Sequence, residues 1–119
     1  MDRKTSIILI ENDPLSLTLY KRELAKYYQV IECHAEEHLT ALLEQLPNVV
    51  VIVEPVGANK WAWKFLEQLT EISFPIVFCT VLDMQKQAHN VGYSLYLRKP
   101  VFAHVLREQI EKLIALQTV

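Results

Sequence analysis

The run Val49-Val50-Val51-Ile52-Val53, followed by Glu54-Pro55, decides the fold of this chain. All five residues of the run are β-branched, and such side chains favour a strand over a helix. Because apolar residues occupy consecutive positions rather than alternate ones, the run predicts a central strand that is covered on both faces.

Four further short apolar runs predict strands, and amphipathic segments lie between them. The five predicted strands cover residues 6–10, 29–34, 49–53, 75–79 and 94–97. Apolar residues at helical spacing predict helices over residues 14–28, 39–46, 65–72, 84–91 and 102–114. At the first helix, Asp13 and Pro14 form a helix-start signal, with Asp as the N-cap and Pro at the first helical position. Strands that alternate with helices predict right-handed βαβ units, and therefore an α/β fold with a parallel sheet and helices on both faces.

The composition indicates one globular domain. The 119 residues are 51% hydrophobic and 22% charged, which is typical of a folded chain. The net charge of −2, without a basic cluster, gives no reason to expect direct nucleic-acid binding. We predict a single domain over residues 1–119, either standing alone or forming the N-terminal domain of a longer protein.

The chain shows no sign of a membrane or secreted protein. No run approaches the roughly 20 apolar residues that cross a bilayer, and the apolar run near the N-terminus is too short for a signal peptide. Cys33 and Cys79 lie in apolar, strand-like segments, which favours reduced, buried thiols over a disulfide. We therefore expect a cytoplasmic protein.

Polar side chains follow four of the predicted strands. Parallel strands bring their carboxyl ends to one edge of the sheet, where α/β proteins place their functional crevice. Two carboxylates, a hydroxyl and a lysine are predicted to converge there: Glu11, Glu54, Thr80 and Lys99. Carboxylate oxygens suit a hard cation such as Mg²⁺, whereas the lysine and hydroxyl suit the oxygens of an anion.

This order of features resembles the receiver domain of two-component response regulators, the CheY-like superfamily, over residues 6–116. Glu54 falls on the phosphoacceptor position, Thr80 on the switch threonine, Tyr96 on the switch aromatic and Lys99 on the invariant lysine. The resemblance implies a flavodoxin-like, doubly wound (βα)5 fold whose five-stranded parallel sheet has the order 2-1-3-4-5. It also implies a cis peptide bond between Lys99 and Pro100, and a role in phosphorelay signal transduction.

The chain departs from the receiver pattern at the residues that carry phosphotransfer. Glu54 has one more methylene than the aspartate of the family, and a displacement of about 1 Å can slow such transfer about 100-fold. The acidic pair reads Glu11-Asn12, so the Mg²⁺ site formed with Glu54 has two carboxylates instead of three. Ala62 also replaces the glycine that usually opens the third helix. We predict a pseudo-receiver that is not an enzyme, has no cofactor, and binds Mg²⁺ weakly or not at all.

These departures leave three interpretations of the site open, and an electron carrier is a further alternative. A contact between Glu54 and Lys99 either imitates the phosphorylated state permanently or merely neutralises the lysine in a fixed structure. Alternatively, the chain is a still-active atypical receiver in which Glu11, Asn12 and Glu54 hold Mg²⁺ weakly. A flavodoxin-like electron carrier has a similar architecture, but the acidic segment after the first strand would repel the phosphate of a flavin.

Two surfaces are candidates for protein partners. The resemblance implies docking or homodimerisation through helix four, strand five and helix five. Gly92 lies only twelve positions after Thr80, about three fewer than usual, so helix four should lose about one turn. Trp61 is the second candidate, because we expect it to be exposed while Trp63 lies in the core. No metal site is expected from the scattered histidines His34, His38, His89 and His104.

Overall fold

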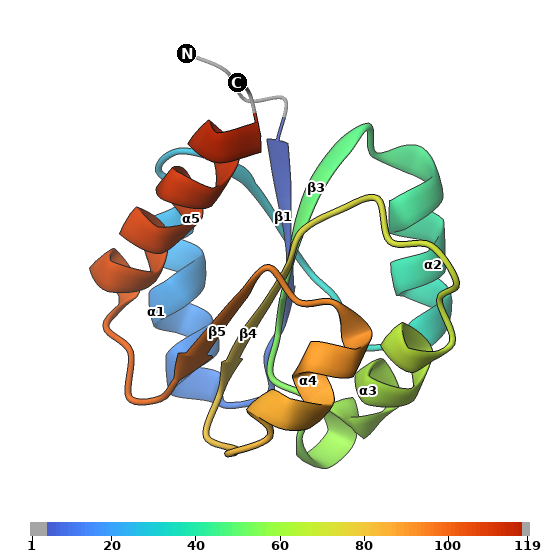
Figure 1. The fold of residues 1–119 in the computed structure, drawn as a ribbon. Helices are drawn as coiled ribbons and strands as arrows, with labels where there is room; N and C mark the ends of the chain where they lie inside the picture. Colours follow the sequence, from blue (N-terminus) through green and yellow to red (C-terminus); the bar gives the residue numbers. More distant parts are fainter. Residues whose placement is uncertain (1–4, 118–119) are drawn as a thin grey trace.

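The computed structural model describes residues 5–117. Within them, five strands alternate with five α-helices, and one short 3-10 helix, η1 (Gly57–Asn59), precedes the third α-helix (Figure 1). The strands are β1 (Thr5–Ile10), β2 (Gln29–Glu32), β3 (Asn48–Val53), β4 (Ile76–Thr80) and β5 (Leu95–Arg98). The α-helices are α1 (Pro14–Leu24), α2 (Glu36–Gln45), α3 (Lys60–Glu67), α4 (Gln85–Val91) and α5 (Ala103–Gln117).

The five strands form one parallel sheet in the order β2-β1-β3-β4-β5. The longest pairing joins β1 to β3, from Thr5 opposite Asn48 to Ile10 opposite Val53. Strand order reverses at β1, since β2 lies on one side of it and β3 to β5 lie on the other. These observations confirm the predicted α/β, flavodoxin-like (βα)5 fold and its strand order.

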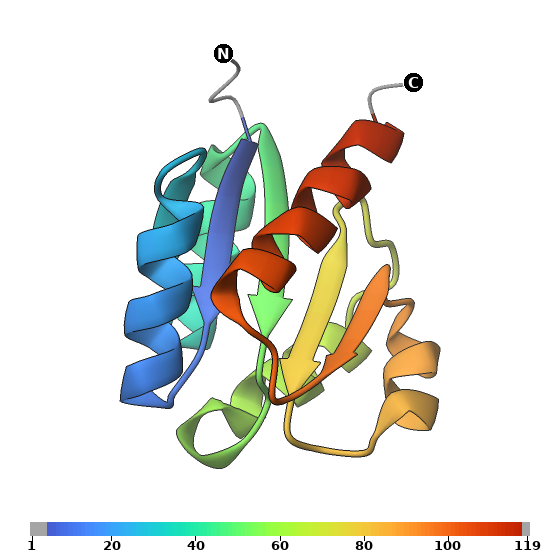
Figure 2. The same cartoon turned by 90° about the vertical axis from the view of Figure 1, so that its left-hand side faces the viewer.

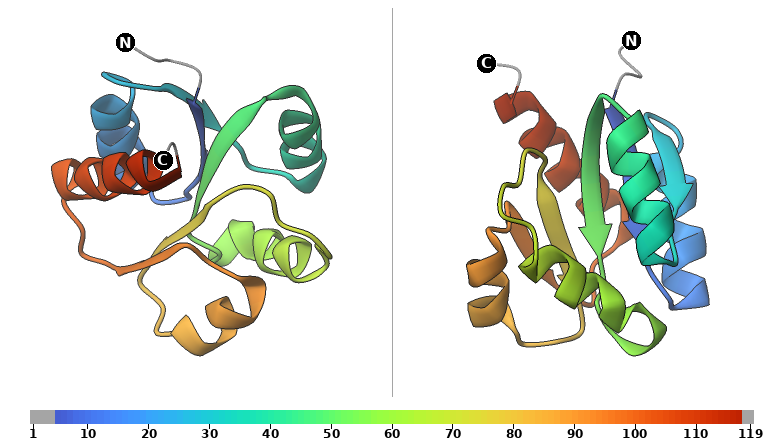
Figure 3. Two further views of the ribbon diagram at one scale, coloured as in Figure 1. Left: turned by 45° about the horizontal axis from the view of Figure 1, so that its top comes forward. Right: turned by 90° about the vertical axis from the view of Figure 1, so that its right-hand side faces the viewer.

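Each face of the sheet carries its own hydrophobic core. Ile8 of β1 and Val51 of β3 belong to the core under α2, α3 and α4, whereas their neighbours Leu9 and Ile52 belong to the core under α1 and α5. Figure 2 views the face that α1 and α5 cover, and the right-hand panel of Figure 3 views the opposite face. Side chains alternate between the faces of a strand, so burial on both sides explains why the strands are apolar at consecutive positions.

Two helices end earlier than the apolar spacing predicts. α1 ends at Leu24 instead of residue 28, and Tyr27 is 42% exposed. The backbone after Leu24 instead forms a turn, with the amides of Tyr27 and Tyr28 donating to the Leu24 carbonyl, because the chain must reverse to enter β2. α3 ends at Glu67 instead of residue 72, and Leu69 and Ile72 pack against the core from the connection to β4.

The structure confirms three smaller sequence predictions. α4 is a short helix of seven residues that ends at Val91, and the φ of +82° at the following Gly92 is the left-handed conformation common just after a helix C-terminus. The Lys99–Pro100 peptide bond is cis, and Cys33 and Cys79 are buried free thiols, as predicted.

The prediction that Trp61 is exposed is wrong. Trp61 and Trp63 are both half-buried and pack against the core beneath α2, α3 and α4, and the indole Nε1 of Trp61 is buried without a hydrogen-bond acceptor. The Trp63 ring meets Phe78 of β4 edge-to-face. Among residues 5–117, no helix is long and apolar enough to span a membrane.

Phe78 should contribute more to stability than any exposed aromatic residue. It is 1% exposed, and its ring meets Trp63 edge-to-face at 5.3 Å and stacks on Tyr96 at 5.8 Å. We expect Phe78→Ala to lower the free energy of unfolding by about 3–5 kcal/mol, because it removes buried area and leaves a cavity. Phe102→Ala, at a ring that is 75% exposed, should change it by less than about 0.5 kcal/mol. Urea unfolding measures both, and equal effects would contradict this description of the core.

Candidate functional site

A pocket of about 590 Å³ opens at the carboxyl edge of the sheet. Its lining comes from the segments that follow β1, β3, β4 and β5, together with the first turns of α1. It includes Glu11, Ser16, Tyr20, Glu54, Val81 and Lys99. The structure therefore places three of the four predicted crevice residues, Glu11, Glu54 and Lys99, around one cavity.

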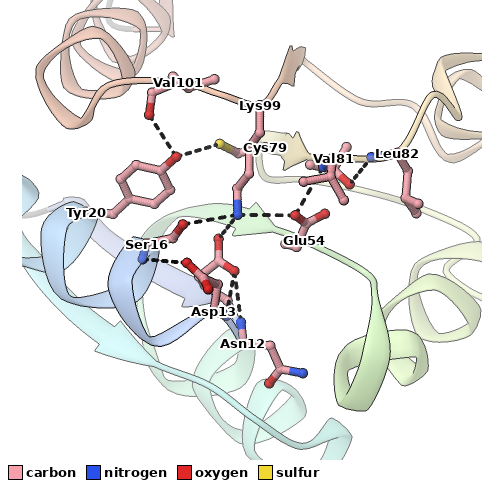
Figure 4. Close-up of polar contacts among 12 residues, drawn as sticks. Asn12, Asp13, Ser16, Tyr20, Glu54, Cys79, Val81, Leu82, Lys99 and Val101 are labelled. Atoms are coloured by element: carbon pink, nitrogen blue, oxygen red, sulfur yellow. Dashed lines mark hydrogen bonds and ion pairs between the residues drawn. The ribbon is translucent and has the colours of Figure 1, made fainter.

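Lys99 lies at the centre of this site, with its ammonium between two carboxylates (Figure 4). Its Nζ lies 2.6 Å from Oε1 of Glu11 and 3.2 Å from Oε1 of Glu54, and it also contacts Oγ of Ser16 at 3.5 Å. The lysine side chain is 10% exposed, and each of the two glutamate side chains is 3% exposed. Burial alone would lower the pKa of Lys99, but its contacts with Glu11 and then Glu54 outweigh burial and raise that pKa. Lys99 is therefore a buried cation.

The backbone after β1 holds the Glu11 carboxylate in place. Its Oε2 accepts hydrogen bonds from the amides of Asn12, at 3.0 Å, and Asp13, at 3.1 Å, while Oε1 accepts from Lys99. Asp13 caps α1 by accepting from the Ser16 amide at 2.9 Å, and this bond is the main reason why the pKa of Asp13 is lowered. Both oxygens of Glu11 thus have partners within the protein.

Glu54 connects the centre of the sheet to the loop after β4. Its Oε1 accepts from the Val81 amide at 3.2 Å as well as from Lys99. Its Oε2 is buried and has no hydrogen-bond partner. Leaving a buried acceptor unpaired costs about 1–3 kcal/mol, and more for a charged group. The site therefore contains one carboxylate oxygen whose hydrogen-bonding capacity is unused.

Side chains from three strands fix the loop between β4 and α4. Thr80 is buried, and its Oγ1 accepts from the Leu82 amide at 3.1 Å. The Tyr96 hydroxyl accepts from the Met84 amide at 2.9 Å and donates to the Leu82 carbonyl at 2.5 Å. Together with the bond from Val81 to Glu54, these contacts hold the backbone at three of the four positions from 81 to 84. Thr80 thus supports the loop and does not line the pocket.

Asn12 does not join the cluster around Lys99. Its side chain is exposed and points away from Lys99 (Figure 4). It lies beside Gly57 instead, where an added Cβ would come within 3.3 Å of its Nδ2. The backbone explains this direction, because the Asn12 amide is turned toward Glu11 and consecutive side chains leave the chain on different sides.

The donor set does not fit the Mg²⁺ site that the sequence resemblance implies. Both oxygens of Glu11 are engaged, Asn12 points elsewhere, and Glu54 offers a single unpaired oxygen beside a lysine ammonium. Within residues 5–117, no three His, Cys, Asp or Glu side chains form a group that could hold a metal ion. A hard divalent cation normally takes several oxygen ligands, and a neighbouring ammonium opposes its charge.

Sequence reasoning missed two polar residues of the pocket, Ser16 and Tyr20. They lie four residues apart on α1, the helical spacing that places both on one face. The Tyr20 hydroxyl donates to the Val101 carbonyl at 2.9 Å and accepts from the Cys79 thiol at 3.7 Å. In the sequence, Tyr20 fits the apolar spacing of the helix predicted over residues 14–28, and its hydroxyl gives no separate signal.

Comparison with solved structures identifies the architecture. A two-component response regulator from Clostridium difficile superposes with a TM-score of 0.81 at 18% identity, covering 97% of this chain and 99% of that one. A receiver domain from Bermanella marisrubri gives 0.79 at 19% identity over 95% and 99%, and a response regulator from Thermotoga maritima gives 0.76 at 16% over 93% and 98%. This chain has the receiver fold. No protein-family model and no curated protein matches it.

Glu54 and Lys99 lie in the fold where the resemblance to receiver domains implies that they should lie. Glu54 follows the central strand, Lys99 follows the last strand, and both reach the same crevice. Tyr96 is turned inward, where its hydroxyl bonds the loop after Thr80. At these low identities the comparisons establish the fold, and the roles of these residues remain predictions.

Removing the buried cation should destabilise the receiver fold strongly. We expect Lys99→Met to lower the free energy of unfolding by about 3–5 kcal/mol, because it leaves Glu11 and Glu54 buried without a counter-charge. Lys21→Met is the matched control, since Lys21 pairs with Glu32 at the same 2.6 Å but on the surface. An exposed pair contributes about 1 kcal/mol or less. Losses of equal size in urea unfolding would show that burial does not strengthen the Lys99 contacts.

The Cys79 thiol beside Tyr20 should make stability depend on pH. Burial is the main reason why the pKa of Cys79 rises to about 11, whereas an unfolded thiol titrates near about 8.5. The native state keeps its proton while the unfolded state loses it, so stability is complete below about pH 8.5 and declines as the pH rises toward about 11. From this thiol we expect a loss of about 2 kcal/mol between about pH 8 and about pH 10.

Urea unfolding at several pH values tests this expectation with Cys79→Ala as the comparison. The variant keeps every other titrating group, including Cys33, whose pKa is also raised by burial. Its free energy of unfolding should therefore decline less steeply than that of the wild type over the same range. Parallel curves for the two proteins would refute the assignment to Cys79.

Proposed function

We propose that this chain is a receiver-like module of a two-component, phosphorelay signalling system that acts through protein–protein contacts and is not phosphorylated at Glu54. One observation carries the proposal: the Lys99 ammonium is already held by Glu11, Glu54 and Ser16. The receiver fold supports the broad assignment, since the solved structures that share it are described as response regulators or their receiver domains. We place the module in the cytoplasm.

The charges around Glu54 oppose the approach of a phosphoryl group. Phosphoryl transfer relies on positioned cations that neutralise the charge of the transferred group. In this crevice the single ammonium faces two buried carboxylates, and Asp13 adds a third at the pocket wall. The donor set also does not fit Mg²⁺. An incoming phosphate therefore meets net negative charge where the reaction needs positive charge.

The loop arrangement supports a module whose surface does not depend on phosphorylation. Glu54, Thr80 and Tyr96 fix the loop from Val81 to Met84 with side chains of the unmodified protein. We propose that this arrangement presents the face of α4, β5 and α5 to a protein partner or to a second copy of the chain. The contact of Glu54 with both Lys99 and the loop supports a fixed structural role for Glu54.

Intact-mass spectrometry after incubation with Mg²⁺ and acetyl phosphate tests the proposal. We expect no gain of a phosphoryl group on the wild-type chain, while an ordinary receiver domain in the same mixture gains one. The double variant Asn12→Asp/Glu54→Asp restores the acidic residue types of the family, and a gain on this variant alone would assign the loss of transfer to these two positions. A gain on the wild type that maps to Glu54 would refute the proposal and favour the still-active atypical receiver.

A further inference from the structure

Lys99, the Val81 amide and the Tyr20 hydroxyl already have partners within the protein. The Lys99 ammonium donates to Glu11 Oε1 and Ser16 Oγ and forms an ion pair with Glu54 Oε1. The Val81 amide donates to Glu54, and the Tyr20 hydroxyl donates to the Val101 carbonyl. An anion entering this pocket would have to displace one of these internal bonds.

The unused hydrogen-bonding capacity of the pocket is that of an acceptor. Oε2 of Glu54 is buried and accepts no hydrogen bond. Asp13 lines the same pocket, is exposed, and uses its Oδ2 to cap α1. Three carboxylates lie around the cavity with one ammonium, which leaves a net charge of −2. Such a site is complementary to a cation that carries N–H groups.

Much of the remaining wall of the pocket is apolar. Val56, Val81 and Val101 line it, so an aliphatic chain would find contacts beside the carboxylates. Leu15 and Phe102 adjoin the lining residues Ser16 and Val101 in the chain, and they are 67% and 75% exposed. Lysine and arginine combine an aliphatic stem with a cationic end in this same order.

We propose that the pocket binds a basic side chain, lysine or arginine, presented by a protein partner. Its N–H groups donate to the carboxylates of Asp13 and Glu54, while its stem lies against Val81 and Val101. This inference rests on the proposed function, in which the module acts through protein contacts, and it specifies the chemistry that the partner brings to the crevice. The exposed side chains of Leu15 and Phe102 then contact the residues that flank the basic one.

A side-chain analogue tests this inference on the full chain. We expect n-butylguanidinium to cause saturable shifts of the Val81 amide and its neighbours in ¹H–¹⁵N correlation spectra, with a dissociation constant in the millimolar range. The matched probe is n-butyltrimethylammonium, which has the same charge and a similar stem but no N–H group. It should bind at least about tenfold more weakly, because it cannot donate to Glu54. Equal binding of the two probes would overturn the inference.

Two variants test the proposed acceptors, and a third serves as a control. Glu54→Gln removes the charge with little change of shape and should weaken binding of n-butylguanidinium about tenfold or more. Asp13→Asn keeps a residue that can cap α1, and its exposed position leads us to expect a smaller loss of about threefold. Glu37→Gln removes one exposed carboxylate on α2, away from the pocket, and should leave the affinity unchanged. Wild-type affinity in both Glu54→Gln and Asp13→Asn would also overturn the inference.

The same samples separate this inference from the proposed function. Phosphorylation of the wild type by acetyl phosphate would refute the proposed function, whereas the titration alone decides whether the pocket takes a basic group. Absence of n-butylguanidinium binding in a chain that is not phosphorylated would overturn only the inference. Shifts of the same amides with inorganic phosphate at lower concentration than with n-butylguanidinium would show an anion site and refute it as well.

Discussion

The buried ammonium of Lys99 is the contact on which the rest of this structure depends. It follows β5 at one side of the sheet, yet it reaches Glu11 after β1 and Glu54 after β3, with Ser16 of α1 beside them. One cation thus connects three strand ends that are far apart in the sequence. Two buried carboxylates so close together need a counter-charge, so the lysine also makes their burial possible.

The same contact determines what the crevice can do. A lysine that faced solvent would attract an anion, but this lysine is surrounded by acceptors of its own protein. The length of the glutamate side chain is part of this arrangement, since Oε1 of Glu54 meets both the Val81 amide and Lys99. The extra methylene therefore links the centre of the sheet to the loop after β4. In the proposed function, the Glu54 carboxylate supports this loop and does not accept a phosphoryl group.

The sequence predicts the fold well because the fold depends on patterns of burial. Consecutive apolar residues identify the strands, and the residues that follow them identify Glu11, Glu54 and Lys99 as neighbours. The helix ends at Tyr28 and Ile72 were wrong, since apolar residues in a connection pack against the core as well as those in a helix do. Periodicity does not distinguish the two cases.

The direction of single side chains lies beyond such patterns. Asn12 follows Glu11 directly, yet only the engagement of its backbone amide decides that its side chain leaves the crevice. Trp61 is half-buried and packs against the core, although its position near the start of α3 gives no such signal in the sequence. Ser16 and Tyr20 also escape such patterns. Their positions fit an amphipathic helix, so the sequence does not reveal that their hydroxyls form hydrogen bonds at the pocket.

Buried polar atoms that lack a hydrogen-bond partner are concentrated in one segment of this chain. Among residues 5–117, the buried side-chain atoms without hydrogen-bond partners are Oε2 of Glu54, both polar atoms of the Asn59 amide and Nε1 of Trp61. All of them lie between positions 54 and 61, at the end of β3 and the start of α3. Each such group lowers stability by about 1–3 kcal/mol relative to a satisfied one. A chain selected only for folding would replace them with apolar residues, as it does in the rest of the core. Departures from local consistency are expected at functional sites, and of these three residues Glu54 is the one that lines the pocket.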